Sequence, residues 1–219
     1  DEIIVLSQNV QNYFQDTYGR KTVFIPNGIG RPVCCEPEEI TALYGLQKSE
    51  YILFLGRLVP EKGLANLVQA FRQVKTDKKL VIAGGSSDSG VFKRELIALA
   101  DGDDRILFTD FVQGRPLEEL YSNAYFYTLP SDLEGMPLSL LEAMSYGNAC
   151  LVSDIPECTE VVKDHAVTFR KGDREDLREK LQMLCDSPET VARFKEGACE
   201  YILEKYNWDD VVQQTLALY

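Results

Sequence analysis

A loop with two cations and two glycines follows an early apolar run of the chain. It reads Gly56-Arg57-Leu58-Val59-Pro60-Glu61-Lys62-Gly63 and leads into a helical pattern. An arginine supplies a planar fork of donors and a lysine supplies a mobile ammonium, so Arg57 and Lys62 together could grip a diphosphate. The alternative is a surface loop with two solvated cations.

A second segment, residues 129–144, places two glutamates around the start of a helix. It reads Leu-Pro-Ser-Asp-Leu-Glu-Gly-Met-Pro-Leu-Ser-Leu-Leu-Glu-Ala-Met, with Glu134 before the expected helix and Glu142 about one turn further in. Gly135 lets the backbone approach a ligand closely, and the free amides of residues 136–139 favour anions. Ionised carboxylates only accept hydrogen bonds, so the glutamates suit sugar hydroxyls, while amides and helix dipole suit phosphates. The alternative is acids in the first turns of an ordinary helix.

Short apolar runs alternate with helical patterns from residue 51 onward, which is typical of strand–helix units around a parallel sheet. The expected strands are 51–55, 79–83, 105–108, 125–129, 149–152 and 166–169. The expected helices between them lie near 63–75, 90–100, 116–122, 137–146 and 156–163. Six parallel strands with helices on both faces predict a doubly wound, Rossmann-like α/β domain whose ligand lies beyond the carboxyl ends of the strands.

The two ends of the chain depart from this alternation. The first 32 residues predict a separate unit of strand, helix, strand and turn, at 3–6, 8–18, 22–25 and 26–28. Residues 30–49 are a plausible linker because they carry two prolines and a Cys-Cys pair. The last part is purely helical, with expected helices at 173–185, 187–206 and 207–219.

Composition limits the classes of partner. The net charge of −12 repels phosphate polymers, which argues against nucleic acid or anionic lipid as the main partner and leaves phosphate binding to local donors. Six cysteines without a C-x-x-C pair indicate reduced thiols in a cytoplasmic protein. The single histidine, His165, excludes histidine-rich metal sites within this chain and is expected in a turn at a strand start. The start of the chain, which lacks Met, indicates a piece of a longer protein.

The motifs, in their order, resemble the C-terminal domain of family 4 retaining glycosyltransferases, also called group 1 enzymes. The resemblance rests on residues 56–63, on residues 130–144 with their Glu-seven-Glu spacing, and on Ser-Asp-Ile-Pro-Glu through Glu at 153–160. It implies a GT-B architecture, in which two α/β domains face a cleft. Residues 1–32 then resemble the tail of the N-terminal, acceptor-binding domain, and residues 33–219 the C-terminal domain that binds the nucleotide sugar.

The resemblance also implies roles for individual residues. Arg57 and Lys62 contact the donor diphosphate, Glu142 the ribose, and Glu134 the hydroxyls of the transferred sugar. Arg57, Lys62 and the helix N-terminus stabilise the leaving diphosphate, so no metal or other cofactor is expected. Glu134 as a covalent nucleophile is a less favoured alternative. The full set of expected donor-binding residues is Gly56, Arg57, Lys62, Val112, Glu134, Gly135, Met136, Pro137, Leu138 and Glu142, of which Arg57, Lys62 and Glu134 are the catalytic candidates.

Four further segments are possible ligand contacts. The loop Asp110-Phe111-Val112-Gln113 corresponds to the segment beside the base. Residues 83–87, Ala-Gly-Gly-Ser-Ser, do not match G-x-G-x-x-G and suit a donor-cleft loop better than a nicotinamide site. Residues 101–104, Asp-Gly-Asp-Asp, look like a metal-binding Asp-x-Asp but are expected to form an ordinary turn. At 154–155 this chain has Asp-Ile where many relatives have two glycines, which leaves the sugar contacts of that loop open.

The expected function is transfer of a sugar from a nucleoside diphosphate sugar to an acceptor, with retention of anomeric configuration, in the full-length protein. The acceptor, a glycan, lipid or small molecule, would bind the missing N-terminal domain, so this chain alone is expected to be inactive. Peripheral membrane association of the full-length protein is left open. The alternatives are a nucleotide-sugar epimerase or glucan synthase of the same fold, and a non-catalytic nucleotide-sugar-binding module. The sequence names neither base, sugar nor acceptor.

Overall fold

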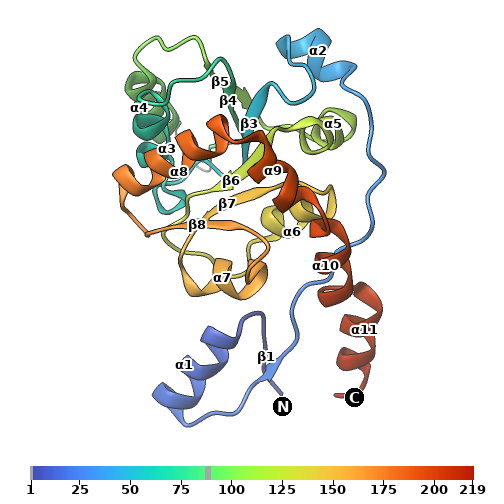
Figure 1. Ribbon diagram of the computed structural model, residues 1–219. Coiled ribbons are helices and arrows are strands. Elements are labelled where there is room, and N and C mark those ends of the chain that lie inside the picture. The colour runs from blue at the N-terminus through green and yellow to red at the C-terminus, as the bar shows by residue number, and fades with distance from the viewer. Residues whose placement is uncertain (1, 87–89) are drawn as a thin grey trace.

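A six-stranded parallel sheet forms the centre of the computed structural model, which describes residues 2–86 and 90–219 (Figure 1). The strand order is β5-β4-β3-β6-β7-β8, and every neighbouring pair is parallel. The fold class predicted from the alternating pattern is confirmed. Two strands, 51–55 and 79–83, have the expected bounds, and the other four differ from the expected bounds by one or two residues at one or both ends. The strands are β3 (Tyr51–Leu55), β4 (Lys79–Ala83), β5 (Ile106–Asp110), β6 (Phe126–Leu129), β7 (Cys150–Ser153) and β8 (Val167–Phe169).

Helices cover both faces of the sheet, which explains why its central strands are apolar throughout rather than alternating. Residues 51–54 and 126–129 are buried along their whole length. On one face α3, α4 and α8 pack together, whereas α5 and α6 lie on the other face, as Figure 1 shows. The bounds are α3 (Leu64–Phe71), α4 (Val91–Ala100), α5 (Arg115–Asn123), α6 (Leu138–Ser145), α7 (Pro156–Val162) and α8 (Arg174–Asp186).

The strand order reverses between β3 and β6, which lie side by side at the centre of the sheet. In doubly wound folds, ligands bind at such a switch point, outside the carboxyl ends of the strands. The loop with Arg57 and Lys62 follows β3, and the loop with Glu134 follows β6. Topology therefore brings the two charged segments of the sequence to the same place.

The C-terminal helical region differs from the expectation in one respect. The single helix expected over 187–206 is wrong, because the chain forms α9 (Pro188–Lys195) and α10 (Ala198–Lys205) instead. Glu196 is extended and Gly197 has a φ of +75°, a left-handed conformation that glycine adopts without strain. The last helix is α11 (Trp208–Leu216).

The expected linker 30–49 contains a helix that the sequence analysis missed, α2 (Glu39–Tyr44), which packs on α5. Glu119, a fully buried residue of α5, accepts hydrogen bonds from the amides of Glu38 and Ile40 at 2.9 and 3.0 Å and from Arg115 Nε at 3.0 Å. Burial alone would raise the pKa of Glu119, but these hydrogen bonds outweigh it and the pKa is lowered. An ionised side chain on α5 thus holds the start of α2, which has no cap of its own.

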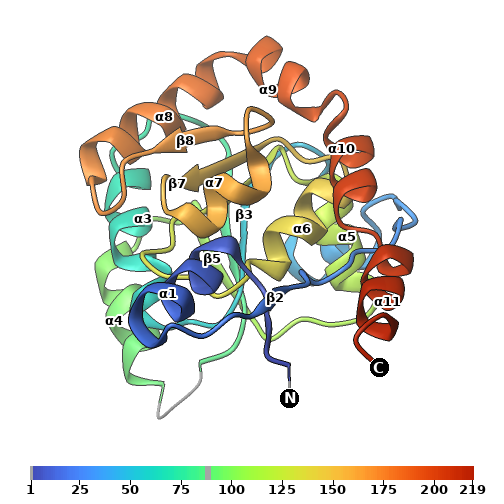
Figure 2. The same ribbon diagram turned by 90° about the horizontal axis from the view of Figure 1, so that it is seen from below.

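The first 32 residues form a small unit outside the main sheet. It comprises β1 (Ile4–Val5), α1 (Gln8–Tyr18) and β2 (Val23–Phe24), the expected order of elements, although both strands are shorter than expected. The two strands pair in parallel. Figure 1 shows this unit and α11 at the lower end of the molecule, and Figure 2, seen from below, shows α1 and α11 on either side of that end. Within the described ranges, no helix is long and apolar enough to cross a membrane.

Candidate functional site

The loops after β3 and β6 meet through a short ion pair between Lys62 and Glu134. Lys62 Nζ lies 2.6 Å from Glu134 Oε1, and the two side chains are only 14% and 6% exposed. Both residues were expected to contact the same ligand, but a direct contact between them was not predicted from the sequence. In the ligand-free chain the two charges neutralise each other, so a bound anion has to share the ammonium with the carboxylate.

Backbone contacts hold these two loops in register. The 3₁₀ turn η1 (Pro60–Lys62) ends at Gly63, where a Cβ atom would lie 2.0 Å from the carbonyl oxygen of Pro130. Only glycine permits this approach, and its φ of +67° is also left-handed. On the other side, the amide of Asp132 donates to the carbonyl of Glu61 at 2.8 Å. The Lys62–Glu134 pair therefore rests on two loops that are fixed to each other.

The start of α6 offers fewer free amides than expected. Pro137 has no amide hydrogen, and the amide of Leu138 donates to the carbonyl of Met136 at 2.9 Å. The expectation that backbone donors run through these positions is therefore wrong for Pro137 and Leu138. The amides of Gly135, Met136 and Ser139 donate to no other group within residues 2–86 and 90–219. These three amides are the donors left for an anion at this helix start.

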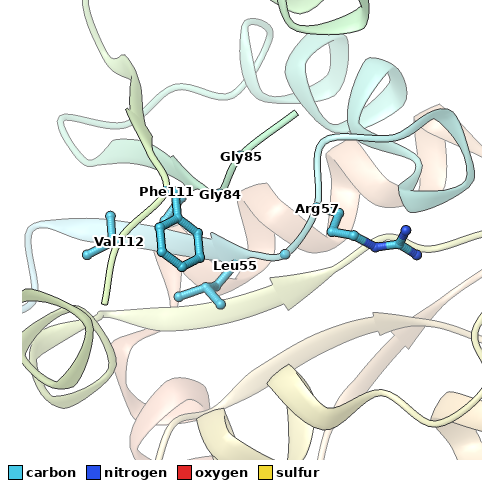
Figure 3. Close-up of a pocket in the computed structure, with 8 residues that line it drawn as sticks. Leu55, Arg57, Gly84, Gly85, Phe111 and Val112 are labelled. Carbon is cyan, nitrogen blue, oxygen red and sulfur yellow. The ribbon is translucent and has the colours of Figure 1, made fainter. Parts of the chain in front are cut away.

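Arg57 lies at the carboxyl end of β3 with its side chain exposed. Its guanidinium makes no hydrogen bond or ion pair with the described part of the chain, although its carbonyl accepts a hydrogen bond from the amide of Val59 at 3.1 Å. Figure 3 shows its guanidinium directed away from Phe111 and Val112. This cation is thus available to an anionic ligand without first breaking a described contact.

An apolar pocket of about 190 Å³ opens beside Arg57 (Figure 3). Its walls include Leu55, Gly56, Gly84, Gly85, Phe111 and Val112. The 83–87 loop and the 110–113 loop were both expected at the ligand, and residues of both line this one pocket. Ser87 lies outside the described residues. The side chain of Phe111 was not singled out, yet it is 71% exposed at this pocket. Apolar walls with glycine backbone suit a flat ring.

Glu142 lies at a different pocket, of about 290 Å³, between α5, α6 and residues 29–32. Its Oε2 accepts a hydrogen bond from the hydroxyl of Tyr121 at 2.8 Å. Burial, followed by the charges of Tyr127 and Glu142, raises the pKa of Tyr121, so Tyr121 stays a neutral donor. Tyr121 fixes one oxygen of Glu142, a contact that no sequence signal indicated, since Tyr121 reads as an ordinary core aromatic.

The acids that follow β7, one on the loop and two on α7, do not converge on this site. Asp154 accepts a hydrogen bond from the amide of Lys171 at 2.8 Å. Glu157 accepts one from Asn9 Nδ2 at 2.9 Å, and Glu160 accepts one from the amide of Gln8 at 3.2 Å. The last two hydrogen bonds join α7 to the N-terminal unit. Helix α7 therefore forms part of the contact between the N-terminal unit and the main domain.

Three minor expectations are confirmed. Residues 101–104 form a turn, in which Asp103 pairs with Arg105 at 2.7 Å, and the hydrogen bond from Arg105 is the main cause of the lowered pKa of Asp103. His165 lies in a bend before β8 and stacks on Tyr201, with ring centroids 3.8 Å apart. All six cysteines, each of them in the described ranges, are free thiols.

Comparisons with known proteins agree with the geometry. The model of the family Glycosyl transferases group 1 matches residues 38–201. An uncharacterized glycosyltransferase of Methanocaldococcus jannaschii is 30% identical over 192 residues, which cover 80% of this chain and 46% of that protein. The alpha-maltose-1-phosphate synthase of Mycolicibacterium smegmatis is 26% identical over 242 residues, which cover 100% of this chain and 62% of that protein.

Solved structures show the same fold. The Anabaena protein HepE, in a crystal structure with UDP and glucose, matches with a TM-score of 0.89 at 18% identity, over 99% of this chain and 62% of that one. This chain therefore spans about half to three fifths of the length of the relatives it matches.

Proposed function

The chain belongs to the group 1 glycosyl transferases, and on that basis we propose that it is the part of such an enzyme that binds a nucleoside diphosphate sugar. The observation that carries the proposal is the ion pair between Lys62 and Glu134 at the carboxyl ends of β3 and β6. Arg57, whose guanidinium has no partner among the described residues, lies on the same loop as Lys62. Two cations and a carboxylate at this switch point match a ligand that carries both phosphates and hydroxyls.

The donor would lie across the switch point in three parts. Its base would enter the apolar pocket against Phe111 and Val112. Its diphosphate would lie between Arg57, Lys62 and the free amides at the start of α6. Its sugar would place a hydroxyl on Glu134. The Anabaena structure, which shares this fold, contains UDP and glucose, and this supports a nucleoside diphosphate sugar as the class of ligand.

Glu142 is proposed to accept hydrogen bonds from the ribose hydroxyls. One of its oxygens is held by Tyr121, and the other has no hydrogen-bond partner in the described part of the chain. A carboxylate fixed on one side and free on the other can accept hydrogen bonds from ribose hydroxyls. Glu142 lines the pocket next to α5 rather than the one beside Phe111, so the ribose would lie between the two pockets.

Sugar transfer would proceed through electrostatic stabilisation of the leaving group. The bond between the anomeric carbon and the diphosphate oxygen breaks, and its electron pair stays on the diphosphate. An acceptor hydroxyl oxygen forms the new bond to the anomeric carbon, and its proton passes to the diphosphate oxygen that the sugar has left. Arg57 and Lys62 are placed to stabilise the negative charge that grows on the diphosphate, which is the reason to propose a reaction without a metal ion.

Retention of anomeric configuration and the role of Glu134 belong to the same proposal. Glu134 would position the sugar through its hydroxyls rather than attack the anomeric carbon, because its Oε1 already accepts from Lys62 at 2.6 Å. The acceptor would bind a further domain, of which residues 1–32 would be the tail. The hydrogen bonds of Gln8 and Asn9 to α7 support a placement of that domain beside the donor side.

A binding screen tests the proposal. UDP, GDP and ADP, each free and with its sugar, are added to the chain while its melting temperature is followed, and at least one pair should raise it. For the best ligand, Arg57→Ala should weaken binding by about 1.5–3 kcal/mol, the worth of a charge-assisted hydrogen bond. Arg193→Ala, on α9, is the matched control and should have no effect. No shift with any nucleotide, or equal effects of the two substitutions, would contradict the proposal.

A further inference from the structure

A buried serine lies directly behind the carboxylate of Glu134. Ser131 follows the end of β6 and is fully buried. Its hydroxyl donates a hydrogen bond to Glu134 Oε1 at 2.6 Å, the same oxygen that Lys62 Nζ contacts at 2.6 Å. Glu134 Oε2 has no hydrogen-bond partner among residues 2–86 and 90–219. Two donors on one oxygen therefore set the rotation of the carboxylate and leave the other oxygen for a ligand.

The position of Ser131 is itself fixed by three strand ends. Ser153, the last residue of β7, donates its hydroxyl to the carbonyl of Ser131 at 2.5 Å. The next amide, that of Asp132, donates to Glu61 in the loop after β3. Ser153 is fully buried as well. Because elements from β3, β6 and β7 all contribute, the backbone of Ser131 is fixed at the carboxyl ends of these strands, and the Glu134 hydrogen bond then sets the direction of its buried hydroxyl.

The two donors to Glu134 differ in what a ligand does to them. Lys62 carries a mobile ammonium that a diphosphate attracts, so its bond to Glu134 weakens or is shared when the donor binds. Ser131 is neutral and buried, so it stays in place. Only one of the two contacts is thus independent of the ligand.

We infer that Ser131 is a positioning residue that holds Glu134 in the orientation which recognises the sugar of an intact nucleotide sugar. This inference rests on the proposed function, because it takes Glu134 as the residue that contacts sugar hydroxyls. It adds a specific consequence: Ser131 contributes to the preference for the nucleotide sugar over the free nucleotide, although it touches neither.

The test compares Ser131→Ala with Thr128→Val. Thr128 lies on β6, is also fully buried, and its hydroxyl has no partner among the described residues, so Thr128→Val removes a buried hydroxyl without removing a hydrogen bond. The probes are UDP, GDP and ADP, each free and as its glucose conjugate. The pair that the unchanged chain binds most tightly is used for all variants, and affinities are measured by calorimetry.

Ser131→Ala should weaken binding of the nucleotide sugar about tenfold, which is the worth of one hydrogen bond to a charged group. Binding of the free nucleotide should change less than about twofold, and Thr128→Val should leave both affinities unchanged. In a Glu134→Ala background, Ser131→Ala should cause no further loss, because its partner is absent. A general loss of packing would instead lower both affinities and would add to the effect of Glu134→Ala.

The outcomes separate this inference from the proposed function. If Glu134→Ala selectively weakens the nucleotide sugar but Ser131→Ala does not, the role of Ser131 is overturned and that of Glu134 stands. Equal losses for both ligands in Ser131→Ala also overturn the positioning role. If Glu134→Ala has no selective effect, or if no nucleotide binds, the proposed function fails and the role of Ser131 fails with it.

Discussion

The Lys62–Glu134 ion pair allows a quantitative prediction about the stability of the ligand-free chain. Lys62→Met removes the ammonium and keeps most of the apolar stem. The carboxylate of Glu134, 6% exposed, is then left with the hydroxyl of Ser131 as its one remaining described donor. An ion whose partner is removed keeps its desolvation cost and loses its compensation, so the substitution should destabilise the fold.

The magnitude follows from the environment of the pair. Removal of one partner from a fully buried ion pair costs about 3–5 kcal/mol. Here Ser131 still donates to Glu134, and the site opens to water at Lys62, which is 14% exposed, so we expect about 2–3 kcal/mol for Lys62→Met. Combined with Glu134→Gln, the loss should be smaller than the sum of the two single losses, with a coupling of about 1.5 kcal/mol.

Urea unfolding followed by circular dichroism, without ligand, measures all four members of this cycle. The control is Lys48→Met, which breaks an exposed pair with Glu36 whose side chains are 61% and 72% exposed. It should cost less than about 0.5 kcal/mol, because exposed ion pairs contribute little. A coupling below about 0.5 kcal/mol between Lys62 and Glu134 would refute the reasoning. It would mean that the pair does not hold in solution.

The remaining predictions concern the metal, the buried acid and the proposed acceptor domain. Calorimetry of nucleotide binding should give the same affinity with EDTA as with magnesium, because Arg57 and Lys62 are proposed to take the place of a divalent ion. Binding that EDTA abolishes and magnesium restores would contradict this. Glu119→Gln should lower the free energy of unfolding by about 2 kcal/mol at pH 7, the worth of a charge-assisted hydrogen bond. The pKa of Glu119 is lowered in the folded state, so its ionised form stabilises the fold fully above the unfolded pKa of about 4.3, and this stability is lost as the pH falls through the folded pKa. Urea unfolding of the wild type and of Glu119→Gln should therefore give free energies that converge in acid. A difference that stays constant with pH would count against the assignment. In a radiolabelled-donor assay this chain should bind donor but transfer no sugar, because on the proposed arrangement the acceptor binds a further domain and both reactants must meet in one oriented cleft. Turnover equal to that of a protein that includes the proposed domain would disprove this.

Local sequence patterns determined most of the fold. Continuous apolar runs such as Tyr51–Leu55 predict strands buried on both faces, and their alternation with helical patterns predicts a parallel sheet. The motif order also placed Arg57, Lys62 and Glu134 on loops after strands. One error arose where a short segment depends on a distant partner. The helix α2 was missed because its first amides are satisfied by Glu119, about 80 residues away in the sequence.

The tertiary structure alone decided which functional groups contact each other. The sequence identified Lys62 and Glu134 separately, but the two residues are 72 positions apart, and their 2.6 Å ion pair depends on β3 and β6 being neighbours. The role of Ser131 behind Glu134 also depends on β7 reaching its carbonyl through Ser153. The periodicity and the residue types of a segment predict which of its side chains are buried and where the chain turns. Direction and distance between side chains on different strands arise only once the sheet order is fixed, because long-range pairing, not local propensity, sets them.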